Sequence, residues 1–286
     1  MSAMPSQARV ALVQLSAGLD QVANIETIAR LTADLAADLI VLPEAAMHDF
    51  GPPDAPLGTA AQPLDGPFVG VLAGLARARH AGVVAGMFER SDHPERPYNT
   101  LVALGPDGTL LGTYRKAHLY DSFGYRESDR LTPGDAVPVT VDVAGTRFGL
   151  MTCYDLRFPE LARALVDVGA EALAVPAAWV RGPFKEDHWV TLIRARAIEN
   201  TVYVAAAAQC GRTYCGRSML VDPMGVVVAS LGEAEGAVIG AIEPARLAAV
   251  RKQNPALEHR RWRVTPINAE GRRPRGARRR AGPTRS

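Results

Sequence analysis

In the first part of the chain, short apolar runs alternate with segments whose apolar residues repeat every three or four positions. The runs Val10–Leu15, Leu39–Leu42 and Gly82–Phe88 predict buried strands. Between them, the apolar spacing predicts one helix from its cap at Asp20 to about Ala37 and another from Pro67 to His80. This order of strand, helix and strand is typical of parallel strands connected by crossover helices.

Turn signals in the rest of the chain predict hairpins among further strands and helices. Short Gly-containing turns separate two pairs of strands: Asn99–Leu104 from Thr109–Tyr114, and Val137–Val143 from Thr146–Thr152. The remaining apolar patterns predict helices from Pro159 to Val168 and from Asp187 to Glu199, and strands at Ala172–Val175, Thr201–Ala208, Met219–Asp222, Val226–Ala229 and Val238–Ile242. Crossovers interleaved with hairpins indicate the α/β class, with one mixed sheet or two sheets covered by helices.

The composition is that of a globular protein with little net charge. The 286 residues are 48% hydrophobic and carry a formal net charge of +2. The chain is therefore long enough to bury a large core, and its total charge does not favour nucleic acid as a partner. The charge is uneven, because seven arginines and one acid lie from Glu270 onward. We expect one folded domain over residues 1–251, an irregular extension over 252–270 and an Arg-rich disordered tail over 271–286.

The number of cysteines, the lengths of the apolar runs and the absence of metal-binding or nucleotide-binding patterns predict the cellular location and the cofactors. Cys153, Cys210 and Cys215 are the only cysteines. An odd and low number argues against a disulfide framework, fits a reducing compartment and predicts a cytoplasmic protein. No apolar run reaches the roughly 18 residues that a membrane helix needs, so no membrane partner is expected. No metal-binding or nucleotide-binding pattern is present, so neither a metal nor a cofactor is predicted.

Three reactive side chains stand at the ends of predicted strands. Glu44 follows LIVLP, Lys116 follows LLGTYR, and Cys153 ends RFGLMTC. In α/β sheets, ligands gather at the carboxyl ends of strands, so folding can bring these distant positions together.

Together the three groups form a consistent set for acyl transfer. Cys153 supplies a thiol whose pKa a helix N-terminus is expected to lower, Glu44 a proton acceptor, and Lys116 a charge that stabilises an oxyanion. Taken singly, each residue also fits a structural role: the cysteine in the core, the glutamate as a solvated or capping residue, and the lysine at the surface.

The local sequences around these residues resemble the nitrilase superfamily of carbon–nitrogen hydrolases. The likeness lies in LIVLPEA around Glu44, YRKAHLYD around Lys116 and MTCYDLRFPELAR around Cys153, in the family's order. It implies that residues 1–251 form a carbon–nitrogen hydrolase domain folded as an α-β-β-α sandwich of two mixed sheets. It also implies catalysis by Glu44, Lys116 and Cys153, a second glutamate at Glu127 that holds the lysine or the substrate, and a homodimer or higher homo-oligomer.

The segment CYDLRFPE is similar to the branch that contains omega-amidase and deaminated-glutathione amidase. That likeness implies hydrolysis of a small carboxylate-bearing amide through a thioester on the cysteine, with release of ammonia. The backbone N–H of Tyr154 is expected to help Lys116 hold the oxyanion. Arg157 is expected either to bind the substrate carboxylate or to pair with Asp155 or Glu160.

The chain departs from this branch at Trp179, where those amidases typically have Phe. The larger ring is expected to narrow the acyl pocket. In the same segment, Arg181 and Lys185 favour a second acidic group on the substrate.

Two alternatives remain open at this point. Within enzymes, the alternative is an N-carbamoyl amino acid amidohydrolase, which shares the same catalytic set. Outside enzymes, the basic segment RRPRGARRR suggests a binding protein that attracts nucleic acid or an acidic partner by charge. We favour a solvated tail that binds no partner. The expected partner of the whole protein is therefore a small-molecule amide, and nucleic acid is not expected.

Overall fold

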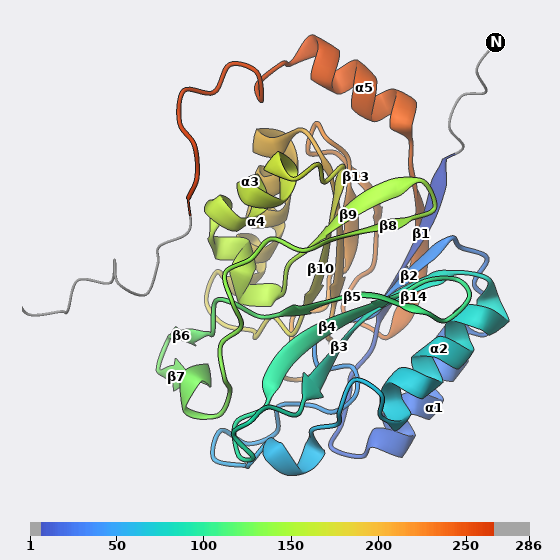
Figure 1. The fold of residues 1–286 in the computed structure, drawn as a ribbon, viewed down its shortest axis with the longest axis vertical. Coiled ribbons are helices and arrows are strands. Elements are labelled where there is room, and N and C mark those ends of the chain that lie inside the picture. Colours follow the sequence, from blue (N-terminus) through green and yellow to red (C-terminus); the bar gives the residue numbers. More distant parts are fainter. Residues whose placement is uncertain (1–6, 266–286) are drawn as a thin grey trace, which may run out of the picture.

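Residues 7–265 are described by a computed structural model in which two sheets lie between two layers of helices. In Figure 1, α1 (Gln21–Thr32) and α2 (Pro67–Arg79) cover one side, and α3 (Pro159–Asp167) and α4 (Lys185–Asn200) cover the other. The tail predicted for residues 271–286, and residues 266–270 of the predicted extension, lie outside the described residues.

The first sheet has six strands in the order β14-β1-β2-β3-β4-β5. Its members are β1 (Ala8–Gln14), β2 (Leu39–Val41), β3 (Gly82–Glu89), β4 (Tyr98–Leu104), β5 (Leu110–Arg115) and β14 (Gly236–Ile242). The strands β1, β2 and β3 run parallel and are connected through α1 and α2, whereas β4, β5 and β14 pair antiparallel. The sheet is therefore mixed.

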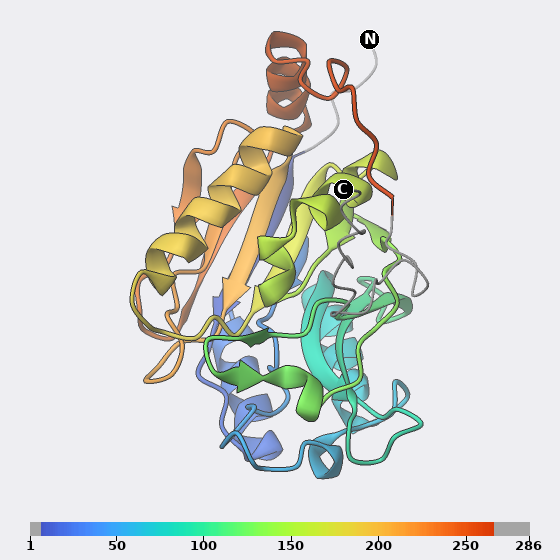
Figure 2. The same ribbon diagram turned by 90° about the vertical axis from the view of Figure 1, so that its left-hand side faces the viewer.

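The second sheet also has six strands, in the order β13-β12-β11-β10-β9-β8. Its members are β8 (Thr140–Val143), β9 (Thr146–Leu150), β10 (Ala172–Ala177), β11 (Tyr203–Ala208), β12 (Met219–Val221) and β13 (Val227–Ser230). The strands β9, β10 and β11 are parallel and the outer strands antiparallel. Figure 2 looks onto this side and shows α4 crossing the sheet with α3 beside it. The α-β-β-α sandwich expected from the sequence is confirmed.

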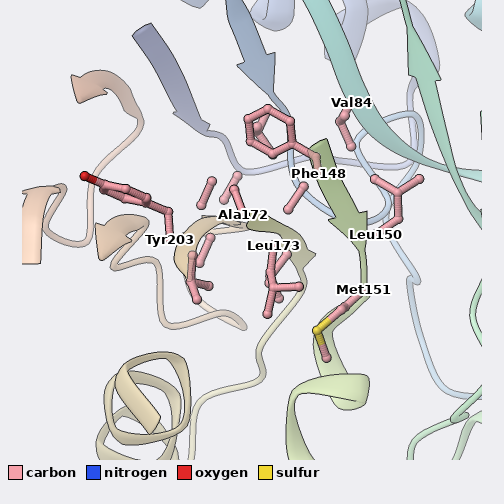
Figure 3. Packing of buried hydrophobic residues seen from close by; sticks show 14 of the residues in the cluster. Val84, Phe148, Leu150, Met151, Ala172, Leu173 and Tyr203 are labelled. Atoms are coloured by element: carbon pink, nitrogen blue, oxygen red, sulfur yellow. The ribbon is translucent and has the colours of Figure 1, made fainter. Parts of the chain in front are cut away.

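Alternating side chains of the first sheet separate the core into two parts. Val10 and Leu12 of β1 belong to the cluster between the sheets, whereas Ala11 and Val13 belong to the cluster under α1 and α2. This is the period of two that a strand buried on both faces produces. In Figure 3, Val84 of the first sheet lies close to side chains of β9 in the second sheet. The packed sheets hold the strand ends in fixed relative positions.

Two helix boundaries differ clearly from those expected. The helix expected to start at Asp187 begins at Lys185, because Phe184 adopts a left-handed conformation (φ 57°) and ends the preceding loop there. The helix capped by Asp20 stops at Thr32 rather than near Ala37.

One helix was not expected at all. The helix α5 (Pro244–Gln253) continues past Arg251, and only Leu247 and Val250 of its residues are buried. Such a sparse apolar pattern gives little helical periodicity to detect. No helix within residues 7–265 is both long enough and apolar enough to span a bilayer.

Candidate active site

A cavity of about 1030 Å³ is lined by residues that follow three of the strands. Glu44 comes after β2, Lys116 directly after β5, and Cys153 after β9, and all three line this cavity. Other residues that the sequence singled out also line it: Glu127, Tyr154, Trp179, Arg181 and Lys185. The fold thus brings together side chains that are 72 and 109 positions apart from Glu44 along the chain, as 116 − 44 and 153 − 44.

Close packing against β3 positions Glu44. A Cβ atom on Gly86 would lie 2.6 Å from the Cα atom of Glu44, so only glycine lets the two backbones approach this closely. The backbone N–H of Gly86 donates to the carbonyl of Pro43, and that of Ala46 donates to the carbonyl of Gly86. From the second sheet, the Gln209 amide donates to the carbonyl of Glu44 at 3.0 Å. The glutamate is therefore held by both sheets.

The carboxylate of Glu44 is buried and accepts hydrogen bonds on both oxygens. Its Oε1 accepts from Lys116 Nζ at 2.9 Å and from Asn99 Nδ2 at 2.7 Å. Its Oε2 accepts from the backbone N–H of Ala178 at 2.7 Å. A buried carboxylate with this many donors is fixed in one orientation.

Lys116 lies between two buried carboxylates. Its Nζ donates to Glu44 at 2.9 Å and to both oxygens of Glu127 at 2.9 and 3.0 Å, and its side chain is 2% exposed. Glu127 also accepts from the backbone N–H of Tyr120. The expected contact between Glu127 and the lysine is present, and it spans the loop that follows β5.

The buried charges do not cancel. Two carboxylates face one ammonium, which leaves one excess negative charge in a site from which water is largely excluded. Burial lowers the pKa of Lys116, but the charges of Glu127 and Glu44 outweigh it and hold this pKa well above its usual value. Burial and the charge of Glu44 raise the pKa of Glu127 in spite of the neighbouring ammonium. The excess negative charge makes the cluster a proton acceptor.

Cys153 begins a five-residue 3₁₀ turn, Cys153–Arg157, in a left-handed conformation (φ 45°) that non-glycine residues rarely adopt. Burial, followed by the charge of Glu44, raises the pKa of its thiol well above the usual value. The expectation that a helix N-terminus lowers this pKa is therefore wrong. The α-helix begins only at Pro159, and desolvation beside a carboxylate dominates.

A buried carboxylate braces the turn that carries the cysteine. Asp155 accepts hydrogen bonds from the backbone N–H of Thr152 at 2.9 Å, from the Tyr114 hydroxyl at 2.8 Å, and from the backbone N–H of His118 at 3.2 Å. The ring nitrogen Nδ1 of His118 lies 2.7 Å from the same carboxylate. Asp155 thus joins the turn of Cys153 to the segment that follows β5.

We expect Asp155→Asn to destabilise the protein and to lower turnover. An amide in place of the carboxylate points its NH₂ group at one set of these donors, so buried hydrogen bonds are lost at a cost of about 1–3 kcal/mol. Urea unfolding followed by tryptophan fluorescence measures the loss. Asp142→Asn on the exposed edge strand β8 is the matched control and should change the stability by less than about 0.5 kcal/mol. Equal stability of the two variants would contradict the bracing role.

Aromatic side chains form much of the remaining wall of the cavity: Phe50, Tyr120, Phe123, Tyr125, Tyr154, Trp179 and Tyr214. The indole N–H of Trp179 donates to the carbonyl of Lys185 at 2.7 Å, which fixes the plane of the ring. Tyr120 and Tyr154 meet edge to face, with their ring centroids 5.0 Å apart. Most of the cavity wall is therefore apolar.

Arg157 does not line the cavity. Its guanidinium lies 4.8 Å from the centroid of the Trp179 ring and 3.3 Å from His188 Nδ1. The alternative in which Arg157 pairs with Asp155 or Glu160 is not what the described residues show. Its contact with a substrate carboxylate stays a prediction.

Several residues that shape the site were missed in the sequence. Asn99 lies inside β4 and donates to Glu44, while Asp155 and Gln209 act through buried hydrogen bonds. The available signal was a polar residue within or directly after an apolar strand, since Asn and Asp are depleted in strands. Such a residue, once buried, needs a partner.

Cys210 and Cys215 lie away from this chemistry. Burial raises the pKa of Cys210 to about 11 and that of Cys215 to about 12, and neither residue lines the cavity. Within the part of the chain that is described, no group of three His, Cys, Asp or Glu side chains is placed to hold a metal ion.

Comparison with known proteins places the chain in a family. The sequence profile described as "Carbon-nitrogen hydrolase" matches residues 9–252. The chain belongs to the carbon–nitrogen hydrolase family. The resemblance to the nitrilase superfamily is thereby confirmed, and the prediction that the protein is an enzyme is confirmed with it.

Individual relatives of this hydrolase agree with that assignment. A protein of Escherichia coli O157:H7 named "Deaminated glutathione amidase" is 43% identical over 245 residues, which cover 84% of this chain and 92% of the relative. The structure of a CN-hydrolase superfamily protein from Xanthomonas campestris matches with a TM-score of 0.82 at 31% identity, covering 91% of this chain and all of the other.

A Saccharomyces cerevisiae protein described as a member of branch 10 of the nitrilase superfamily matches with a TM-score of 0.79 at 30% identity, covering 92% of this chain and 99% of the other. These matches agree with a hydrolase that acts on carbon–nitrogen bonds.

Proposed function

We propose that the cavity is the active site and that Cys153, Glu44 and Lys116 hydrolyse an amide through a thioester. The observation that carries this proposal is the buried Glu44–Lys116–Glu127 cluster on the same cavity wall as the thiol. A single excess negative charge beside a protonated thiol is the arrangement that a general base and its nucleophile need.

In the first half of the reaction, the Sγ atom of Cys153 attacks the amide carbon while Glu44 takes the thiol proton. The raised pKa of the thiol keeps the proton in place until substrate binds, so proton transfer accompanies attack. Lys116 and the backbone N–H of Tyr154 stabilise the oxyanion. Glu44 then gives the proton to the leaving nitrogen, the carbon–nitrogen bond breaks, and the acyl group remains on sulfur.

In the second half, Glu44 takes a proton from water, and the resulting hydroxide attacks the thioester carbon. The carbon–sulfur bond breaks, the carboxylic acid leaves, and the proton returns to the sulfur. Glu127 is a positioning residue in this scheme, because both of its oxygens accept hydrogen bonds from Lys116.

For the substrate we propose a small amide that carries a carboxylate. The name of the Escherichia coli relative makes deaminated glutathione the first candidate. A cavity of about 1030 Å³ supports a substrate of this size, since ligand pockets usually measure about 300–1,000 Å³. N-carbamoyl amino acids are the competing class.

A substrate panel tests the proposed function. Deaminated glutathione, alpha-ketoglutaramate, N-carbamoyl amino acids and simple nitriles are each incubated with the protein, and ammonia and free amine are measured. We expect hydrolysis of one or both carboxylate-bearing amides and none of the nitriles. A mass spectrum of the intact protein with a slow amide substrate should show the acyl group on Cys153. Turnover of carbamoyl amino acids alone would overturn the proposed substrate class.

We also propose a cytoplasmic location and a homodimer or higher homo-oligomer. The free state of Cys153, Cys210 and Cys215 supports a reducing compartment, and the family resemblance supports self-association. Gel filtration with light scattering measures the oligomeric state.

A further inference from the structure

The wall of the cavity carries a buried ammonium without an acidic partner. Lys185, the first residue of α4, is 6% exposed and lines the cavity. Its Nζ donates to the Tyr120 hydroxyl oxygen at 3.1 Å. The same nitrogen lies 4.8, 4.7 and 5.0 Å from the ring centroids of Tyr120, Phe123 and Trp179. Within residues 7–265, no carboxylate forms an ion pair with it.

Two other cations, Arg181 and Arg157, lie near Lys185, and neither brings a carboxylate into an ion pair with it. Arg181, which also lines the cavity, is paired with Glu233 at 3.1 Å. Arg157 approaches the same Trp179 ring as Lys185, and its buried Nε atom has no hydrogen-bond partner. Two positive charges therefore flank one indole ring, and neither has a carboxylate beside it.

An isolated buried charge of this kind is costly. Burial and the nearby charge of Arg157 lower the pKa of Lys185. The position at the first residue of a helix adds the positive end of the helix dipole, which also disfavours a cation. Glu186 and Asp187 share the first turn but line a separate surface pocket. An anion inside the cavity would relieve all of these costs at once.

We propose that Lys185 binds a carboxylate of the substrate, so that the cavity selects amides with an anionic group remote from the bond that is cleaved. The inference rests on the proposed function and names the residue that sets its specificity. Because the ammonium donates to the oxygen of the Tyr120 hydroxyl, the hydroxyl hydrogen is available to the same carboxylate. The surrounding rings exclude water and so strengthen the ion pair. Arg157 contributes its charge from beside the cavity.

Three probe amides test the inference: glutaramate, the neutral pentanamide of equal chain length, and N-pentanoylglycine, whose carboxylate lies on the leaving amine. Ammonia or glycine release gives kcat and KM. For Lys185→Met, the ratio of kcat/KM for glutaramate to that for pentanamide should fall by about 10- to 100-fold, mainly through KM. Lys185→Arg should restore most of the ratio. A fall seen with N-pentanoylglycine instead would place the bound carboxylate on the leaving amine.

The control is Lys252→Met, which removes an exposed ammonium in α5 and should keep the wild-type ratios. Unchanged ratios in Lys185→Met would overturn the inference and leave the proposed function standing if the wild type hydrolyses the probes. An equal loss on all three probes would assign Lys185 a structural role and would also overturn it. A wild type inactive on all amides would overturn the proposed function itself, and the inference with it.

Discussion

Cys153→Ala should abolish amide hydrolysis and leave the folded structure intact. Without sulfur no thioester forms, and the buried carboxylates and Lys116 cannot supply a nucleophile of their own, so turnover should fall by at least about 1000-fold. The side chain is small and 8% exposed, and its loss should change the free energy of unfolding by no more than about 1 kcal/mol. Steady-state hydrolysis and urea unfolding measure the two effects.

Cys215→Ala is the matched control for this variant. Cys215 is also buried but does not line the cavity, so its variant should retain turnover. In the intact-mass experiment, Cys215→Ala should still form the acyl adduct and Cys153→Ala should not. Undiminished hydrolysis by Cys153→Ala would rule out this nucleophile and end the proposed mechanism.

Glu44 and Cys153 could be located in the sequence because each follows an apolar run, whereas Lys116 follows the mostly exposed strand β5. Leu39–Val41 and Thr146–Leu150 are buried strands, and the polar residue after such a run lies at the edge of the sheet. The α/β class followed from the same runs. The pairing of Glu44 with Asn99, 55 positions away, depends on which strands neighbour each other, and no local pattern encodes that order.

The direction of the Cys153 pKa shift was misjudged for a related reason. A strand followed by a helix suggests a dipole that favours the thiolate, and this reasoning uses only neighbours in the chain. In the fold, burial and Glu44 dominate the shift, and both result from packing between distant segments. Desolvation is a tertiary property, so the sequence around the cysteine does not report it.

The positions of the cations near the cavity show the same limit of local sequence patterns. From the sequence, Arg157 was expected either to bind the substrate carboxylate or to pair with Asp155 or Glu160, and Arg181 and Lys185 favoured a second acidic group. The helix α4 begins at Lys185 rather than near Asp187, and Lys185 lines the cavity while Arg157 does not. Which cations line the cavity is a tertiary property, so the local sequence does not report it.

Removing the ammonium of Lys116 should strongly lower both the activity and the stability of the protein. In Lys116→Met, Glu44 and Glu127 lose their shared cation and face each other across a buried site. Leaving buried charges uncompensated costs about 3–5 kcal/mol near neutral pH. The oxyanion also loses its charged donor, so turnover should fall by about 100- to 1000-fold. Urea unfolding and steady-state hydrolysis measure these losses.

The destabilisation in Lys116→Met should depend on pH in a defined direction. With two carboxyl groups and no ammonium, the folded protein keeps a proton that the unfolded chain releases above about pH 4.3. The folded state then binds more protons than the unfolded state, so its stability relative to wild type falls as pH rises from about 5 to about 8. Lys252→Met, at an exposed site, should follow the wild-type profile. A destabilisation that stays constant over this range would show that Lys116 does not control the charge of the two glutamates.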